Sequence, residues 1–147
     1  MTGILLSGCN GKMGKVITAA AANTDDIEIV GEAGAGYPVF ASPTEVTPEV
    51  LARTDVIIDF SNPSAFAGLI EFAVKEAKPA VFATTGLNEA QLTLLHHAAE
   101  KIPVFFAANM SLGVSLISEL AQKAAKVLGD DFDIEIVEMH HNQKADG

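Results

Sequence analysis

Short apolar runs alternate with helix-length segments along nearly the whole chain, and this alternation restricts the fold more than any other feature of the sequence. Runs typical of strands occur at 3–8, 27–32, 55–60, 80–86, 103–109 and 132–139. Segments with helical periodicity or helix-capping signals lie between them, at 12–22, 62–77, 88–101 and 112–128. Strands that alternate with helices pair in parallel. We therefore expect an α/β fold, a Rossmann-like doubly wound parallel sheet of about six strands in three layers, α/β/α.

Two of the expected helices begin at recognisable capping sequences. Asn62 can cap a helix whose first residue is Pro63. Asn88 and Gln91 form a loose version of the capping box. The segment 33–54 carries three prolines and little periodicity, so we expect a loop there with at most one helical turn.

A glycine-rich loop, GCNGKMG, joins the first expected strand to the first helix. Gly8 allows a tight turn, Gly11 allows backbone to approach a pyrophosphate, and Gly14 allows close packing of helix on strand. Asn10 replaces the second glycine of the commonest fingerprint, a mild change because Asn tolerates positive φ. The helix N-terminus supplies free N–H groups for phosphates, and Lys12 adds a cation. The alternative is a turn that binds nothing.

The composition excludes several classes of protein. The 147 residues carry nine Lys and Arg against nineteen Asp and Glu, a net charge of -10. Nucleic acid is therefore not an expected partner, because binding it needs a basic face. The single Cys9 rules out an internal disulfide framework and fits a reducing compartment. With neither a run of about eighteen apolar residues nor a signal-peptide pattern, the chain is expected to be cytoplasmic, without a membrane partner.

Three later strand ends carry small or polar residues, at 59–63 (DFSNP), 83–86 (ATTG) and 107–111 (AANMS). Ligands of open α/β sheets bind beyond the carboxyl ends of the strands. Together these ends therefore predict a cleft, although each alone is compatible with an ordinary turn. Phe60 could cover a nicotinamide ring or belong to the core.

These motifs together resemble one enzyme family, 4-hydroxy-tetrahydrodipicolinate reductase of the diaminopimelate–lysine pathway. The resemblance rests on GCNGKMG, IDFSNP, ATTG, FFAANMSLGV and above all DDFDIEIVEMHHNQKAD, in order along essentially the whole chain. It implies a cytoplasmic oxidoreductase that uses NADPH or NADH to reduce a small cyclic dicarboxylate with loss of water. The residues that it implicates in cofactor binding are Gly8, Cys9, Asn10, Gly11, Lys12, Met13, Phe60, Ala83, Thr84, Thr85, Ala107, Ala108, Asn109 and Met110.

The choice between NADH and NADPH stays open. An acid about 20 residues beyond the glycine loop binds the adenosine ribose in many dinucleotide sites. Glu32 lies near that distance, but the family's acidic position falls on Gly34.

The chain's last residues, EMHHNQKADG, carry the chemistry that the resemblance implies. His140 would be the general acid or base, since imidazole titrates near neutrality. Lys144 would donate a proton, and His141 would contact a substrate carboxylate. Without the resemblance, a solvated polar tail is the favoured interpretation. A metal site is not expected, because adjacent residues of an extended chain point in opposite directions and chelate poorly.

The resemblance also implies a domain organisation. Residues 1–130 would form the dinucleotide-binding domain, and 131–147 the start of the crossover to a substrate and tetramerisation domain beyond Gly147. The family is homotetrameric, and this part alone is expected to bind cofactor without turnover. Two alternatives remain: a stand-alone NAD(P)-binding module without catalysis, or another imine or amino-acid dehydrogenase of the same fold.

Overall fold

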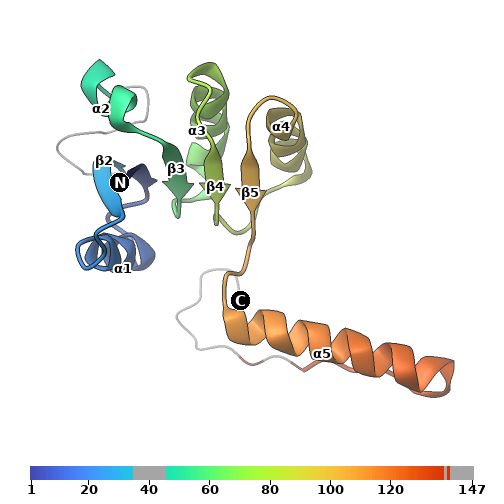
Figure 1. Cartoon of the computed structure of the whole chain (residues 1–147). Helices are drawn as coiled ribbons and strands as arrows, with labels where there is room; N and C mark the ends of the chain where they lie inside the picture. Colours follow the sequence, from blue (N-terminus) through green and yellow to red (C-terminus); the bar gives the residue numbers. More distant parts are fainter. Residues whose placement is uncertain (35–45, 138, 140–147) are drawn as a thin grey trace. The chain divides into compact units, whose positions relative to one another are not determined.

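The computed structural model describes residues 1–34, 46–137 and 139 (Figure 1). Within it the chain forms two compact units, Met1–Ala108 and Asn109–Gly147. The first unit contains a five-stranded parallel sheet in the order β2-β1-β3-β4-β5. Its strands are β1 (Thr2–Ser7), β2 (Ile27–Ala33), β3 (Val56–Asp59), β4 (Ala80–Phe82) and β5 (Val104–Phe106).

Helices connect the strands as the alternation predicts. They are α1 (Lys12–Ala21), α2 (Pro48–Arg53), α3 (Pro63–Lys75) and α4 (Glu89–Ala99) in the first unit, and α5 (Leu112–Leu128) in the second. None of the helices in the described ranges combines the length and the apolar character that a bilayer crossing requires.

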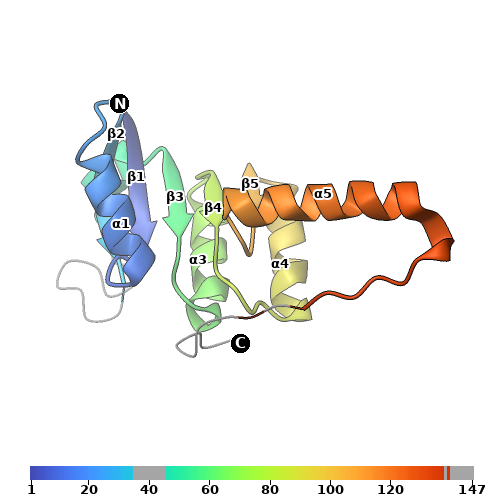
Figure 2. The same cartoon turned by 90° about the horizontal axis from the view of Figure 1, so that it is seen from below.

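Helices cover both faces of the sheet, which makes the fold doubly wound (Figures 1 and 2). On one face, Leu5 and Ile57 pack with residues of α3 and α4. On the other, Ile4 and Leu6 pack against Ile17 of α1. Neighbouring residues of β1 thus enter different cores, as the alternation of side chains along a strand requires. The expected Rossmann-like α/β fold is confirmed.

The largest core lies between the sheet and α3, where two aromatic rings meet. Phe66 of α3 and Phe82 of β4 are both fully buried, with ring centroids 5.0 Å apart and an interplanar angle of 60°. Edge-to-face packing of this kind adds to the stabilisation that burial of each ring supplies, about 2–3 kcal/mol. The contact holds α3 on β4, and so fixes where the turns after β3 and β4 begin.

The order of the strands places a switch point between β1 and β3. The chain moves from β1 outward to β2, then returns to pair β3 with the other edge of β1. The connections on the two sides of β1 lead away in opposite directions, which leaves a crevice at the carboxyl ends of these strands. The glycine loop follows β1 and therefore lies at this crevice.

Helix capping follows the sequence signals closely. The Asn62 side chain accepts from the Ser64 N–H (2.9 Å), and Asn88 and Gln91 make both bonds of the capping box. The prediction of at most one helical turn in 33–54 is wrong, because α2 has six residues, which is more than one turn. Thr47 caps it and Pro48 follows at its first position, a start signal that the count of prolines obscured.

The second unit contains α5 and a short 3-10 helix, Gly129–Asp131. Ser111 caps α5 by accepting from the Val114 N–H. The strand expected at 132–139 is a wrong prediction for the described part of that segment, since 132–137 and 139 form no strand. Alternating apolar and acidic residues favour a strand locally, but a strand also needs a hydrogen-bonding neighbour. The sheet therefore has five strands in the described chain, one fewer than expected.

Candidate functional site

The glycine loop turns sharply at the end of β1 and is anchored to β2. Gly8 has φ of +82°, a conformation that side chains disfavour. Its N–H donates to the carbonyl of Ala33 at the end of β2 (2.8 Å), and the Gly11 N–H donates to the Gly8 carbonyl (3.0 Å). The loop is thus a fixed turn placed between two strand ends.

Two glycines are required here by close approach of backbone. A Cβ on Gly8 would lie 2.5 Å from the carbonyl carbon and oxygen of Phe60, after β3. A Cβ on Gly14 would lie 2.4 Å from the Gly8 carbonyl oxygen. Gly8 therefore lets the loop rest on the turn after β3, and Gly14 lets α1 begin directly beneath the loop.

The N-terminus of α1 is suited to an anion. Gly11 is its N-cap residue, so no side chain caps the helix, and no acidic residue lies in its first turn. The first amides of a helix point outward with a partial positive charge. Lys12 is exposed at the same end. The arrangement matches that of a phosphate-binding loop.

A cleft of about 420 Å³ opens beside the glycine loop. It lies at the carboxyl ends of β1, β2 and β3, the crevice that the switch point creates. Its lining is mostly backbone and small side chains: Ser7, Gly8, Asn10, Gly11, Ala33, Gly34, Phe60, Ser61, Asn62, Ser64, Ala65 and Leu69. Such a wall lets a flat or phosphorylated ligand approach the main chain.

One polar atom of this wall has no partner among the described residues. The Ser61 hydroxyl oxygen is buried and makes no hydrogen bond there. Buried polar atoms are nearly always paired in native proteins. The glycine loop, the uncapped N-terminus of α1 and this unpaired hydroxyl fit a dinucleotide, whose phosphate and ribose oxygens could bond to them.

Cys9 lies under the loop rather than in the cleft. It is buried and packs with Ile4 and Leu6 on the α1 side of the sheet. Burial, and to a lesser degree the nearby Glu32 carboxylate, raises the pKa of the Cys9 thiol. A neutral thiol is a poor nucleophile, so Cys9 is a packing residue in this geometry.

Glu32 contacts α1. Its carboxylate accepts a hydrogen bond from the Thr18 hydroxyl (3.3 Å), and it does not line the cleft. Gly34 does line the cleft, and a Cβ there would lie 3.2 Å from the Cys9 sulfur. At this end of β2 the cleft is therefore lined by Gly34, whereas the carboxylate of Glu32 is hydrogen-bonded to Thr18 of α1.

The structure brings together part of the expected cofactor site. Gly8, Asn10, Gly11 and Phe60 line one cleft. The other expected residues in the described chain lie outside its lining: Cys9, Lys12 and Met13 at the loop, Ala83, Thr84 and Thr85 after β4, Ala107 and Ala108 after β5, and Asn109 and Met110 in the second unit. His140, His141 and Lys144 fall outside the described residues.

Thr84 is placed differently from its neighbours. Its side chain is buried and donates to the carboxylate of Asp59 (2.5 Å), whereas Thr85 is exposed. Any contact of Thr84 with a ligand would therefore come from its backbone. Sequence reasoning missed Asp59, because only the pairing of β3 with β4 brings these two residues together. It also missed Ser61; the strand-end motif DFSNP contains both residues but gives neither a role.

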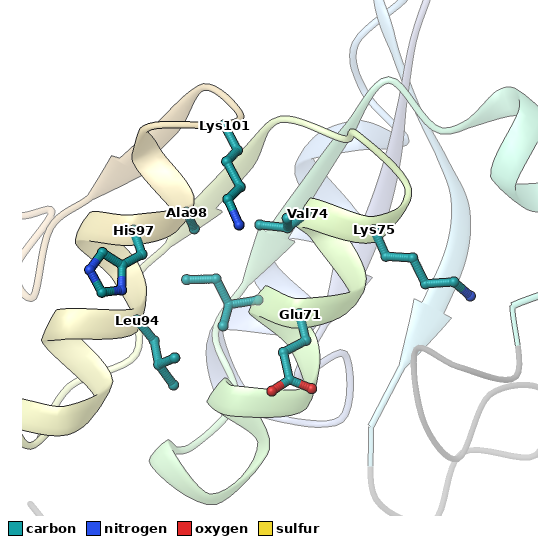
Figure 3. Close-up of a pocket in the computed structure, with 8 residues that line it drawn as sticks. Glu71, Val74, Lys75, Leu94, His97, Ala98 and Lys101 are labelled. Carbon is teal, nitrogen blue, oxygen red and sulfur yellow. The ribbon is translucent and has the colours of Figure 1, made fainter.

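A second hollow, of about 250 Å³, lies between α3 and α4 (Figure 3). Val74, Leu94 and Ala98 form its apolar part, and Lys75 points away from it in Figure 3. It lies between two helices rather than at strand ends, so we do not assign the dinucleotide to it. No group of three potential metal ligands occurs in the part of the chain that the structure describes.

Comparison with models of protein families identifies the family of this chain. The family model for "Dihydrodipicolinate reductase, N-terminus" matches residues 2–110. The model for "Dihydrodipicolinate reductase, C-terminus" matches residues 113–147. This chain belongs to the dihydrodipicolinate reductase family.

Curated relatives carry the systematic name of the same family. The 4-hydroxy-tetrahydrodipicolinate reductase of Clostridium tetani is 41% identical over 152 residues, which cover 99% of this chain and 58% of that protein. The enzyme of the same name in Caldanaerobacter subterraneus is 43% identical over 151 residues, with the same coverage. In Zymomonas mobilis the identity is 47% over 142 residues, covering 96% and 55%. The chain thus spans somewhat more than half the length of these relatives.

A solved structure supports the fold independently. The dihydrodipicolinate reductase of Paenisporosarcina sp. TG-14, determined with bound dipicolinate, superposes with a TM-score of 0.67 at 23% identity. The match covers 85% of this chain and 54% of that one. At this identity the likeness concerns the fold, which agrees with the Rossmann-like sheet described above.

Proposed function

We propose that this chain binds NADH or NADPH as the dinucleotide-binding part of a 4-hydroxy-tetrahydrodipicolinate reductase of lysine biosynthesis. The observation that carries the proposal is the cleft at the switch point between β1 and β3, bordered by Gly8 and the uncapped start of α1. Membership of the family and the names of the relatives support the same function.

Each part of the cleft has a role in binding. The amides at the start of α1 hold the pyrophosphate, because Gly11 at the N-cap has no side chain that would block its approach to the main chain. The Ser61 hydroxyl is free to bond a ribose or phosphate oxygen. The segment 83–85 and Ala107 and Ala108, which follow β4 and β5, serve the nicotinamide half, with Phe60 at the cleft wall.

The reaction needs a hydride, a proton and a leaving hydroxyl group. When bound, the reduced nicotinamide supplies the hydride. The substrate accepts this hydride and one proton and releases its hydroxyl group as water, giving tetrahydrodipicolinate. His140 serves as the general acid, since imidazole exchanges protons near neutral pH. Lys144 supplies a second proton donor and a positive charge, and His141 binds a carboxylate of the substrate.

The proposal also covers the division of the protein. Residues 1–130 serve the cofactor, and 131–147 lead toward the part that binds the substrate and forms a tetramer. The match of a C-terminal family model and the greater length of the relatives support a division into two parts, although that model begins at residue 113 rather than 131. Turnover therefore requires the whole protein, whereas cofactor binding belongs to this chain.

Fluorescence titration of the chain with NADH and with NADPH tests the function. We expect saturable binding of both, with affinities within about tenfold of each other. An acid that binds the ribose hydroxyl favours NADH, and a basic residue beside the 2′-phosphate favours NADPH. Here the carboxylate of Glu32 is hydrogen-bonded to Thr18, and residues 33–45 contain no Lys or Arg.

Two glycine substitutions locate the binding. Gly8→Ala adds a methyl group at positive φ against the Phe60 backbone, so we expect at least about tenfold weaker binding. Gly68→Ala is the matched control, because a Cβ there meets no atom within 4 Å and Gly68 lies within α3. Binding that survives Gly8→Ala, or absence of binding to the unsubstituted chain, would refute the proposed site.

A further inference from the structure

Asp59, the last residue of β3, is an acidic residue with no exposed surface. Its Oδ1 accepts from the Ser61 N–H (3.2 Å), and its Oδ2 accepts from the Thr84 hydroxyl (2.5 Å). Burial of a carboxylate is costly unless it is hydrogen-bonded, and an apolar residue could fill the same space without that cost. The presence of Asp59 therefore needs an explanation beyond core packing.

The two hydrogen bonds of Asp59 join two different turns. Ser61 belongs to the turn after β3, and Thr84 to the segment after β4. The backbone contributes to the same junction, because the Ala83 N–H donates to the Asp59 carbonyl (2.9 Å). Farther out, the Gln91 side-chain amide donates to the Pro63 carbonyl (2.6 Å), which links the starts of α4 and α3. The spacing of the two turns is thus fixed by hydrogen bonds at the strand ends and again at the starts of the helices that follow.

The turn after β3 is also one wall of the cleft. Phe60 and Ser61 line it, and Gly8 packs directly on the Phe60 carbonyl group. A displacement of this turn relative to the segment after β4 would change the distance between the wall at the glycine loop and the residues assigned to the nicotinamide half.

We propose that Asp59 is a positioning residue of the dinucleotide site: through Ser61 and Thr84 it sets the spacing between the turns after β3 and β4. This inference rests on the proposed function. Asp59 itself touches neither cofactor nor substrate, since it is fully buried. Its effect is on the part of the dinucleotide that spans both turns.

Two substitutions break the junction with little change in shape. Thr84→Val removes the hydroxyl donor, and Thr84→Ser restores it. Asp59→Asn keeps one acceptor oxygen but replaces the other by an amide donor, so it cannot accept both bonds. Thr54→Val is the matched control: Thr54 is equally buried, donates one hydrogen bond to the Val50 carbonyl (2.8 Å) and precedes β3 at the opposite end of the strand.

Each variant of the intact chain is titrated with the tighter of NADH and NADPH, and with ADP-ribose or its 2′-phosphate, which lacks the nicotinamide. We expect Thr84→Val and Asp59→Asn to weaken dinucleotide binding about five- to tenfold, the effect of one buried hydrogen bond. Binding of the ligand without nicotinamide should change by less than about twofold. Thr84→Ser should recover dinucleotide binding, and Asp59→Asn should add little to Thr84→Val, because both remove one link.

The unfolding free energy is measured alongside, because Thr84→Val, Asp59→Asn and Thr54→Val each remove a hydrogen bond of a buried residue. Thr54→Val should lower the unfolding free energy as Thr84→Val does, yet leave both affinities unchanged. The positioning role is overturned if Thr84→Val affects dinucleotide affinity no more than Thr54→Val, or if both ligands weaken equally. If Asp59→Asn does not fold, the comparison of Val and Ser at Thr84 decides alone. Failure of the unsubstituted chain to bind either dinucleotide removes the proposed function, and this inference with it.

Discussion

At the scale of single residues, the glycine loop depends on close contacts between backbone segments that only glycine allows. Gly8 rests on Phe60, Gly14 rests on Gly8, and Cys9 fills the space beneath. The spacing of the glycines could be read from the sequence because each glycine reports a local requirement. The partner Phe60 lies some fifty residues away, and its approach to Gly8 depends on the pairing of β1 with β3.

Cys9 gives the folded state a pH dependence on the alkaline side. Because burial raises the Cys9 pKa, the folded chain holds this proton more tightly than the unfolded chain does. The stability is therefore complete below the ordinary pKa of a thiol and falls as the pH rises through the folded-state pKa, by at most about 1.4 kcal/mol per pH unit. Urea unfolding at increasing pH should show this fall.

The matched variant for that measurement is Cys9→Ala, which removes the thiol. It lowers stability at neutral pH through the loss of a buried side chain, but the difference from the unsubstituted chain should shrink as the pH rises. Two curves that stay parallel through the alkaline range would contradict the assignment.

At the scale of elements, the starts of α3 and α4 were the most predictable features and the ends of the strands the least. Asn62 and Asn88 act within three residues of themselves, so the sequence alone indicates them. The expected strand 80–86 ends at Phe82 in the structure. Beyond Phe82, the Thr84 hydroxyl donates a hydrogen bond to the buried carboxylate of Asp59, and no local sequence pattern predicts this interaction.

The capping box of α4 offers a direct measurement at this scale. Asn88→Ala removes the acceptor of the Gln91 N–H and should lower the unfolding free energy by about 1 kcal/mol. Asn88→Asp keeps an oxygen in the same place and should remain close to the unsubstituted chain in a denaturant titration. An equal loss in both variants would show that the amide group, rather than the cap, stabilises the helix.

At the scale of the whole molecule, a net charge of -10 opposes every anionic ligand. The repulsion is long-ranged and is screened within about 10 Å at 0.1 M salt. It acts more strongly on NADPH than on NADH, because NADPH carries an additional phosphate. The amides of α1 contribute equally to both, since they hold the pyrophosphate that the two cofactors share.

The ratio of the two affinities should therefore depend on salt. We expect binding of NADPH to improve relative to NADH by about two- to fivefold when sodium chloride is raised from low concentration to about 0.3 M. Titrations of both cofactors at a series of salt concentrations measure the ratio. A change in the opposite direction would reveal a cation that contacts the 2′-phosphate.

The fold class could be predicted because alternation of strands and helices is visible along the chain, whereas the number of strands in the described chain could not. The segment 132–137 has the alternation of a strand, but the alternation says nothing of a neighbour to pair with. In the candidate site, the sequence indicates the glycine loop and the turn after β3. It does not indicate Asp59, whose role arises only from the register of β3 against β4.

The position of β1 in the sheet has a consequence for biosynthesis. β1 precedes both of its partners along the chain, and it pairs on one edge with β2 and on the other with β3, where Ile4 lies opposite Val56. Both edges of this apolar strand therefore stay unpaired until later parts of the chain are synthesised, and the second edge stays unpaired until β3 (Val56–Asp59) is made. Unpaired apolar edges invite association with other chains. We therefore expect the nascent chain to be prone to association in the interval between the synthesis of β1 and that of β3.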